Sequence, residues 1–326
     1  MPSLYSFYGG IFMADLLKNG TIWLDTDGKE IHAHGGYIIH YEGYYYWYGE
    51  DRRDNIYVSC YRSKNLTDWE FRNHVLTTES QTERYRVWTD TALTHIDTNN
   101  HIKKVNLERP KVLYNKLTGK FVMWMHYEDG FNYSQARCAL ASCDTPDGDF
   151  TYHGSFQPYG YMSRDCTLFC DDDDTAYFIS STRGNADLNV YRLTEDYMNT
   201  DKFVNILWQG ESREAPAVFK KDGIYYILSS HCTGWLPNQG KVGWGKSMEG
   251  SFSLLRNFGD ETTFHSQPAF VLPVEKDGQT RYLYFADRWG ATNELYFTSS
   301  YVVLDIQFDK DGIPFIEYAD TFSGLN

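Results

Sequence analysis

The sequence predicts an all-β protein folded as a five-bladed β-propeller, and three observations point to that fold. No long stretch has helical periodicity, whereas short alternating aromatic runs follow turn residues, as in antiparallel hairpins. Aromatic residues make up 17% of the 326 residues, and they favour strands and surfaces that stack on sugars. The hairpins also recur five times along the chain, as expected of one four-stranded blade per repeat.

Five turns mark the repeats in chain order. The marker residues are Gly43, Gly119, Asp174, Gly223 and Gly278, with spacings of 76, 55, 49 and 55 residues. The aromatic runs that follow them are at 44–50, 120–128, 176–181, 224–230 and 281–289. The longer first interval contains residues 70–100, which are rich in Thr, Asn and Arg and predict a long loop over one face.

One polar residue recurs before each marker at a nearly constant distance. These residues are His34, Glu108, Asp165, Glu214 and Gln267, which stand 9, 11, 9, 9 and 11 residues before their markers. Because the first strand of every propeller blade lines the central channel, we expect them to converge at the mouth of that channel. Three carboxylates held close together have pKa values that move apart, which keeps one of them protonated near neutral pH.

Glycoside hydrolysis requires such a protonated carboxyl, together with a group that positions or deprotonates water. Trp235 and Trp289 are candidate platforms on which the apolar face of a sugar stacks, with burial inside a blade as the alternative for either. The expected partner is therefore an oligosaccharide or polysaccharide.

The composition argues against other partners. Lys and Arg number 30 against 44 Asp and Glu, which gives a net charge of −14, and no basic cluster suits nucleic acid or an anionic membrane. No apolar run approaches the roughly 20 residues of a membrane-spanning helix. A Gly-rich phosphate loop and a nucleophile elbow are missing, and no organic cofactor is indicated.

Residues 1–20 are predicted to form an N-terminal extension and residues 21–326 a single catalytic propeller. The extension has no basic residue before Lys18 and no long apolar run, so it does not resemble a signal peptide. Six cysteines without C-x-x-C spacing suit a reducing compartment. These features predict a cytoplasmic location, and a chain trimmed of its leader would show them too.

No metal ligand set is predicted. The acidic run at residues 171–174 suggests a calcium loop, but it lacks the Gly and the Glu that an EF-hand loop requires. We therefore interpret this run as a solvated hairpin turn.

From about Thr21 to about Gln307 the chain resembles glycoside hydrolase family 43, most closely its exo-β-1,3-galactanase branch. The segments that carry the resemblance are residues 25–50, 108–126, 163–173, 213–238 and 266–274. The resemblance implies a five-bladed propeller that hydrolyses glycosidic bonds with inversion.

The resemblance also implies roles for the recurring polar residues. Glu214 matches the general acid, and Asp165 matches the carboxylate that raises the pKa of the acid and orients it. The usual general-base Asp of blade one is absent, because His34 and small residues stand there. In the galactanase branch, residues matching Gln267 and Glu108 are thought to handle the attacking water.

The identity of the general base stays open among Gln267, Glu108 and His34. An amide is too weak a base to act except by positioning water or through its imidic tautomer. Glu108 is a possible proton acceptor, unless it pairs with Arg109 or another cation and only binds a sugar hydroxyl. His34 is the third candidate, because an unperturbed imidazole has a pKa near 6.5, which suits a base at neutral pH.

Four further positions match residues that contact the terminal galactose in the galactanase branch. They are Glu50, Thr233, His126 and Tyr127, the last two as alternatives. The predicted reaction is release of terminal galactose from β-1,3-linked galactan or galactooligosaccharides. Inversion requires about 6.5–9.5 Å between Glu214 and the water-activating group. The alternatives are an α-L-arabinofuranosidase, a β-xylosidase, a β-galactofuranosidase or a non-catalytic glycan-binding propeller.

Overall fold

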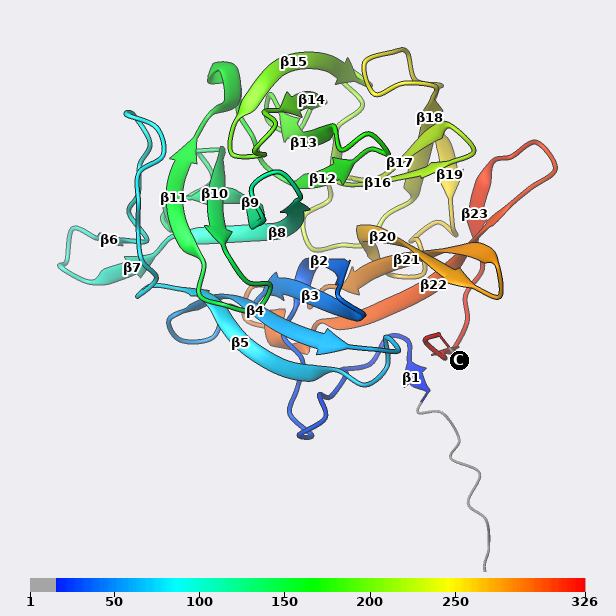
Figure 1. Ribbon diagram of the computed structural model, residues 1–326, viewed down its shortest axis with the longest axis horizontal. Coiled ribbons are helices and arrows are strands. Elements are labelled where there is room, and N and C mark those ends of the chain that lie inside the picture. The colour runs from blue at the N-terminus through cyan, green and yellow to red at the C-terminus, as the bar shows by residue number, and fades with distance from the viewer. Residues whose placement is uncertain (1–15, 326) are drawn as a thin grey trace, which may run out of the picture.

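A computed structural model describes residues 16–325, which form five four-stranded antiparallel sheets arranged around a central channel (Figure 1). The predicted five-bladed propeller is confirmed. Blade one contains β2 (His34–Tyr41), β3 (Tyr44–Glu50), β4 (Ile56–Ser63) and β5 (Glu70–Thr77). Blade two contains β8 (Asn106–Asn115), β9 (Lys120–Glu128), β10 (Arg137–Cys143) and β11 (Thr151–Phe156).

The other three blades follow in chain order. Blade three contains β12 (Cys166–Cys170), β13 (Ala176–Thr182), β14 (Asp187–Leu193) and β15 (Thr200–Leu207). Blade four contains β16 (Arg213–Lys221), β17 (Ile224–His231), β18 (Gly240–Gly245) and β19 (Arg256–Phe258). Blade five contains β20 (Gln267–Lys276), β21 (Gln279–Arg288), β22 (Ser300–Phe308) and β23 (Pro314–Ile316).

Only short elements lie outside the blades in the described part of the chain. They are β1 (Leu17–Lys18), β6 (Thr94–Ile96), β7 (Ile102–Lys104), β24 (Thr321–Phe322) and the 3-10 turns η1 (Pro158–Gly160) and η2 (Tyr296–Thr298). Among residues 16–325, no helix is long and apolar enough to cross a lipid bilayer.

The predicted repeat corresponds to the first hairpin of each blade. Two of the five aromatic runs coincide with β3 and β9, and the other three fall largely within β13, β17 and β21. The marker residues have left-handed φ values of 78°, 70°, 65°, 75° and 74° in chain order. Four of them are glycine because this conformation carries no steric penalty without a Cβ atom. The acidic run at 171–174 is the hairpin turn between β12 and β13, as predicted.

The innermost strands β2, β8, β12, β16 and β20 form a ring in which each contacts both neighbours. His34 and Gln267 begin their strands, Glu108 and Glu214 lie near the starts of β8 and β16, and Asp165 directly precedes β12. The five polar residues thus share one register at the starts of the channel strands, as their constant spacing predicts.

The prediction for residues 70–100 is partly wrong. Residues 70–77 form β5, the outer strand of blade one, and β6 pairs with β7 in a separate hairpin. The chain between them runs beside β11 (Figure 1, cyan), where Glu83 donates to Tyr152 O and Asp90 exchanges backbone hydrogen bonds with Ser155. This segment therefore hydrogen-bonds to the backbone of β11, the outer strand of blade two, instead of covering one face of the propeller.

The two ends of the described chain meet beside blade five. β1 pairs antiparallel with β24 as a separate two-stranded sheet, and Gly20 N donates to Tyr301 O (Figure 1). The Asn19 side chain bonds to both the N–H and the C=O of Val303. Residues 16–20 of the predicted extension thus contact the propeller, and residues 1–15 lie outside the described residues. The ring itself closes where blade one packs against blade five through β2 and β20.

Five hydrophobic clusters fill the five blade interfaces. Trp124 is a central example, because it is fully buried between blades two and three, packs 4.8 Å from the Phe178 ring and donates to Tyr197 O.

Trp124→Ala is expected to lower the free energy of unfolding by about 3–5 kcal/mol, because it opens a cavity in a packed interface. Trp88 is a matched control, since 94% of it is exposed and Trp88→Ala should cost less than about 0.5 kcal/mol. Urea unfolding checks both values. Equal effects of the two substitutions would contradict the assignment of Trp124 to the core.

Candidate active site

In three blades, the pairing of the first strand with the second becomes irregular directly after the polar residue of the first strand. The register shifts after His34, Glu108 and Glu214, and the residues that follow them have left-handed φ values of 56°, 54° and 50°. Only the first of these following residues, Gly35, is a glycine, so Arg109 and Ala215 hold strained conformations. A bulge bends the strand and changes the direction of the neighbouring side chain. The three bulges thus set the direction of these side chains at the starts of the channel strands.

A carboxylate fixes the backbone N–H of each bulge. The three hydrogen bonds run from Gly35 N to Asp287 Oδ2 (3.0 Å), from Arg109 N to Glu50 Oε1 (2.9 Å) and from Ala215 N to Asp165 Oδ2 (3.1 Å). In each case the carboxylate comes from the preceding blade around the ring. Carboxylates from one blade therefore hold the backbone of the next.

Glu214 is a half-buried carboxyl that accepts two amide hydrogen bonds. Its Oε1 lies 3.1 Å from Gln267 Nε2, and its Oε2 lies 3.2 Å from Asn185 Nδ2. Burial and the nearby charge of Asp165 raise the pKa of Glu214 to about 7, although Arg109 opposes the shift. A carboxyl with this pKa is partly protonated at neutral pH, which fits a general acid.

The amide of Gln267 has a defined orientation. Its Oε1 accepts from Trp289 Nε1 at 2.7 Å and from Arg109 Nη2, and both of these groups can only donate. Its Nε2 therefore faces Glu214 and also donates to Ser230 Oγ at 2.8 Å.

The direct contact between Gln267 and Glu214 differs from the separation predicted for an inverting pair. The two side chains touch at 3.1 Å, so no water fits between these two atoms in this arrangement. Water reaches a position between them only after this hydrogen bond breaks.

Arg109 connects the acid to the groups around it. Its guanidinium lies 3.3 Å from Asp165 Oδ2, donates to Pro268 O at 2.9 Å and lies 5.5 Å from the Trp289 ring centre. The possibility that Arg109 pairs with Glu108 is wrong, because the bulge turns its side chain toward Asp165 and Gln267.

Glu108 pairs with a different cation, Arg52. The Arg52 guanidinium lies 3.1 Å from Glu108 Oε1, which also accepts from Tyr133 Oη at 2.5 Å, while His126 Nδ1 lies 3.2 Å from Oε2. Burial favours the neutral acid, but Arg52, His126 and Tyr133 outweigh it and lower the pKa of Glu108 to about 2. Such a carboxylate is a weak proton acceptor, which favours its role as an anionic binding group.

Glu50 is buried with both oxygens engaged. In addition to Arg109 N, it accepts from Arg52 Nε at 3.1 Å and from Arg52 Nη2 at 2.9 Å. The Arg52 guanidinium also lies 4.3 Å from the Tyr296 ring centre. Only 2% of Glu50 is exposed, and its oxygens hold the Arg109 backbone and the Arg52 guanidinium at the edge of the site.

His34 lies below the site surface. It is 1% exposed, its Nδ1 lies 2.9 Å from Asp287 Oδ1, and its ring stacks on Tyr301 at 4.7 Å. Its hydrogen-bonding and ring contacts are those of a satisfied channel residue, and they leave it no route to an attacking water.

The structure separates the other candidates for galactose contact. Tyr127 lies in the hydrophobic core between blades one and two, with its hydroxyl 3.1 Å from His95 Nε2, so its prediction as a sugar contact is wrong. His126, on the other side of β9, faces Glu108. Thr233 is exposed and donates to Leu236 O within its own loop.

A cavity of about 250 Å³ opens beside Gln267 and is bounded by Trp235 and Trp289. The two tryptophans meet edge to face at 5.8 Å and are half-buried, so they line the cavity instead of filling a blade interior. Their predicted use as sugar platforms fits this position. A cavity of this size suits one sugar ring better than an extended chain.

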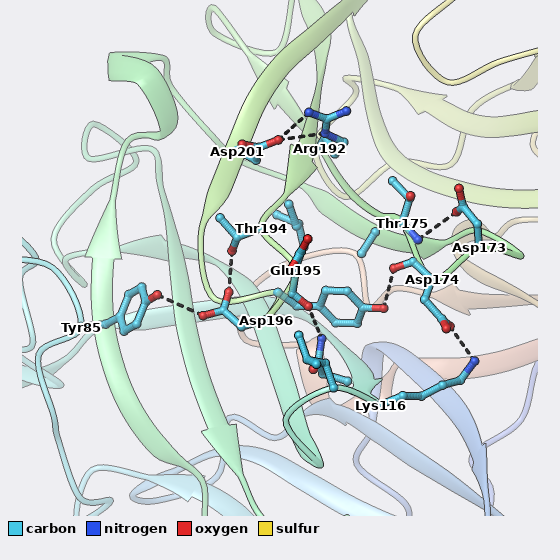
Figure 2. Close-up of a pocket in the computed structure, with 15 residues that line it drawn as sticks. Tyr85, Lys116, Asp173, Asp174, Thr175, Arg192, Thr194, Glu195, Asp196 and Asp201 are labelled. Carbon is cyan, nitrogen blue, oxygen red and sulfur yellow. Dashed lines mark hydrogen bonds and ion pairs between the residues drawn. The ribbon is translucent and has the colours of Figure 1, made fainter.

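A larger cavity, about 910 Å³, lies at the opposite end of the channel strands (Figure 2). It is formed around the β8–β9 and β12–β13 turns, whereas Glu108 and Asp165 lie at the other ends of those strands. Its polar groups largely pair with one another, as Figure 2 shows for Lys116 with Asp174, Arg192 with Asp201, and Tyr85 and Thr194 with Asp196. It is therefore separate from the catalytic cluster. Across residues 16–325, no three His, Cys, Asp or Glu side chains are grouped to hold a metal ion.

Sequence reasoning missed several residues of the site: Arg52, Tyr133, Asn185, Ser230 and Asp287, and it misassigned Arg109. A signal existed for one of them. Asp287 lies directly opposite Gln267, one residue before the end of β21, as Glu50 ends β3 opposite His34. The repeat that located the first strands therefore also locates the second-strand carboxylates.

A family model of glycosyl hydrolases family 43 matches residues 110–314. A search of curated proteins gave no significant match. Among solved structures, an exo-β-1,3-galactanase from Clostridium thermocellum is 44% identical, with a TM-score of 0.85 over 95% of this chain and 67% of that one.

Two further structures extend the comparison. A β-1,3-galactosidase with bound galactodeoxynojirimycin is 32% identical, with a TM-score of 0.81 over 93% of this chain and 99% of that one. An exo-β-1,3-galactanase variant from Phanerochaete chrysosporium with β-1,3-galactotriose is 32% identical, with a TM-score of 0.80 over 94% and 67% of the two chains. With the family match and a propeller whose channel mouth carries an acidic cluster, the chain belongs to glycoside hydrolase family 43 and is a glycoside hydrolase.

Proposed function

We propose that this protein is an exo-acting hydrolase that releases terminal galactose from β-1,3-linked galactan or galactooligosaccharides with inversion. The observation that carries the proposal is the environment of Glu214, where burial and Asp165 raise the pKa of the carboxyl to about 7 beside a sugar-sized cavity. Similarity to exo-β-1,3-galactanases supports the choice of sugar and linkage.

In the proposed reaction, Glu214 gives its proton to the glycosidic oxygen while the bond from that oxygen to C1 breaks. Water attacks C1 from the opposite face and passes its proton to bulk water, so the galactose product has the α configuration. The ionised Glu214 then takes up a proton from solvent before the next turnover. Asp165 keeps Glu214 protonated, and Arg109 holds both Asp165 and the amide of Gln267.

Of the three candidates for handling the water, Gln267 has the position best suited to it. Glu108 is held as a weakly basic carboxylate, and His34 is enclosed by Asp287 and aromatic rings. Gln267 borders the cavity, and its Nε2 can exchange Glu214 for water when substrate enters. Glu108 is proposed to bind sugar hydroxyls.

Product analysis by proton NMR over the first minutes tests the proposal, with β-1,3-galactobiose and β-1,3-galactotriose as substrates. We expect α-galactose to appear before mutarotation, with galactobiose as the second product from galactotriose. Initial release of β-galactose would contradict inversion. Cleavage only of aryl arabinofuranoside, xyloside or galactofuranoside controls would assign another activity of the family, and binding without turnover would make the protein a glycan-binding propeller.

A further inference from the structure

A second carboxylate, Glu128, is buried behind Glu108. It ends β9, is fully buried and accepts through Oε2 from the backbone N–H groups of Gln135 (2.8 Å) and Ala136 (3.0 Å). Its Oε1 lies 3.0 Å from His126 Nε2 and 3.9 Å from Arg164 Nε. Glu128 is therefore held rigidly by the β9–β10 loop and presents one oxygen to His126.

His126 lies between two carboxylates. Its Nε2 faces Glu128 and its Nδ1 lies 3.2 Å from Glu108 Oε2, while 2% of the residue is exposed. A neutral imidazole donates from one ring nitrogen only, whereas the imidazolium donates from both. Two flanking carboxylates therefore favour the charged ring.

The other groups near His126 agree with this protonation state. Burial disfavours the charge, but Glu108 and Glu128 outweigh it and raise the pKa of His126 to about 9. The Tyr133 ring lies 5.9 Å away, with its hydroxyl on Glu108, and Arg52 pairs with the far oxygen of Glu108. Arg164, beside Glu128, is the other cation near this chain of groups.

We propose that Glu128 and His126 are positioning residues that keep Glu108 ionised and fix its orientation toward the sugar. Neither reaches the substrate, because both are buried behind Glu108. His126 forms an ion pair with Oε2 of Glu108 at 3.2 Å, while Arg52 and Tyr133 donate hydrogen bonds to Oε1, so both oxygens of the carboxylate are held. The predicted direct contact between His126 and galactose is replaced by an indirect role through Glu108. The kinetic part of this inference rests on the proposed function.

The protonation state of His126 can be measured without substrate. Nitrogen-15 NMR of the imidazole rings follows each histidine through a pH titration, and the signal absent from His126→Asn identifies His126. We expect a doubly protonated ring up to about pH 8 in the unmodified protein. A neutral His126 ring at pH 7 would overturn the proposal even if the enzyme acts on another sugar.

Glu128→Gln tests the positioning role of Glu128, because Gln has nearly the shape of Glu but no charge. Loss of the negative charge should lower the pH at which His126 loses its proton by at least about one unit. Asp129→Asn is the matched control, because Asp129 caps the same loop through Phe131 N and Gln135 Nε2 but does not contact His126. Its titration should equal that of the unmodified protein. Equal titrations in Glu128→Gln and Asp129→Asn would overturn the role of Glu128.

Kinetics with β-1,3-galactobiose give the functional readout. In Glu128→Gln we expect KM at pH 8 to rise about tenfold, with a smaller change at pH 5.5, where His126 still carries its proton. A merely structural role would lower activity equally at both pH values, and this result would overturn the positioning role. If no galactoside is cleaved by the unmodified protein, the proposed function fails while the titration still decides the protonation of His126.

Discussion

Glu214→Gln is expected to lower kcat on β-1,3-galactobiose by about 10²–10⁴-fold, because the variant cannot protonate the leaving oxygen. Gln keeps the shape of the side chain, so binding of galactose, measured by calorimetry, should change little. Glu211→Gln is a suitable control, since Glu211 is an exposed residue three positions earlier and should leave kcat unchanged.

The leaving group separates loss of the acid from general damage to the site. An aryl galactoside with an acidic phenol departs without protonation, so Glu214→Gln should retain much more activity on it than on galactobiose. Equal losses on both substrates would contradict the assignment of Glu214 as the general acid.

The same variant has an expected effect on stability. Because the pKa of Glu214 is raised to about 7 in the folded protein, its contribution to stability is full below the ordinary pKa near 4.5 and is lost as pH rises through 7. Gln does not titrate, so Glu214→Gln should gain stability relative to the unmodified protein between pH 5 and pH 8. Urea unfolding at the two pH values measures this difference, and a constant difference would contradict the raised pKa.

The repeat made most of the fold predictable. Five turns with left-handed marker residues fixed the blades, and a polar residue at constant register identified the start of each channel strand. The side of the strand that each residue faces was harder to predict. His126 and Tyr127 are neighbours on β9, and only the pairing of His126 opposite Glu108 decides that His126 faces the site while Tyr127 enters the core.

The arginine partners of the site carboxylates were harder to predict, because they depend on backbone irregularities that cannot be inferred from residue types. Arg109 has a positive φ although it is not glycine, and this bulge sends its side chain to Asp165 instead of to its neighbour Glu108. Arg52 reaches Glu108 from another blade, 56 positions away in the sequence. Contacts of this kind follow from the assembled ring, whereas the repeat describes one blade at a time.

Arg109→Met should affect both stability and catalysis. Asp165 would lose its cation, and the oxygens of Gln267 and Pro268 would each lose a donor, so we expect the free energy of unfolding to fall by about 3 kcal/mol. Arg192→Met is the control, because the pair of Arg192 with Asp201 is exposed and should contribute less than about 1 kcal/mol. Urea unfolding measures both.

Adding Asp165→Asn to Arg109→Met separates the two roles of this ion pair. The second substitution removes the unpaired charge, so part of the lost stability should return, because a neutral amide tolerates the site without a cation. Activity should not return, because the double variant lacks two groups. It has lost the Asp165 charge, which helps to raise the pKa of Glu214, and the Arg109 side chain, which orients Gln267. Relative to Arg109→Met alone, the remaining alkaline limit of kcat/KM should move to lower pH, because loss of the Asp165 charge lets Glu214 lose its proton more readily. Recovery of activity together with stability would mean that Arg109 and Asp165 serve the fold alone, and that the acidity of Glu214 is set by burial.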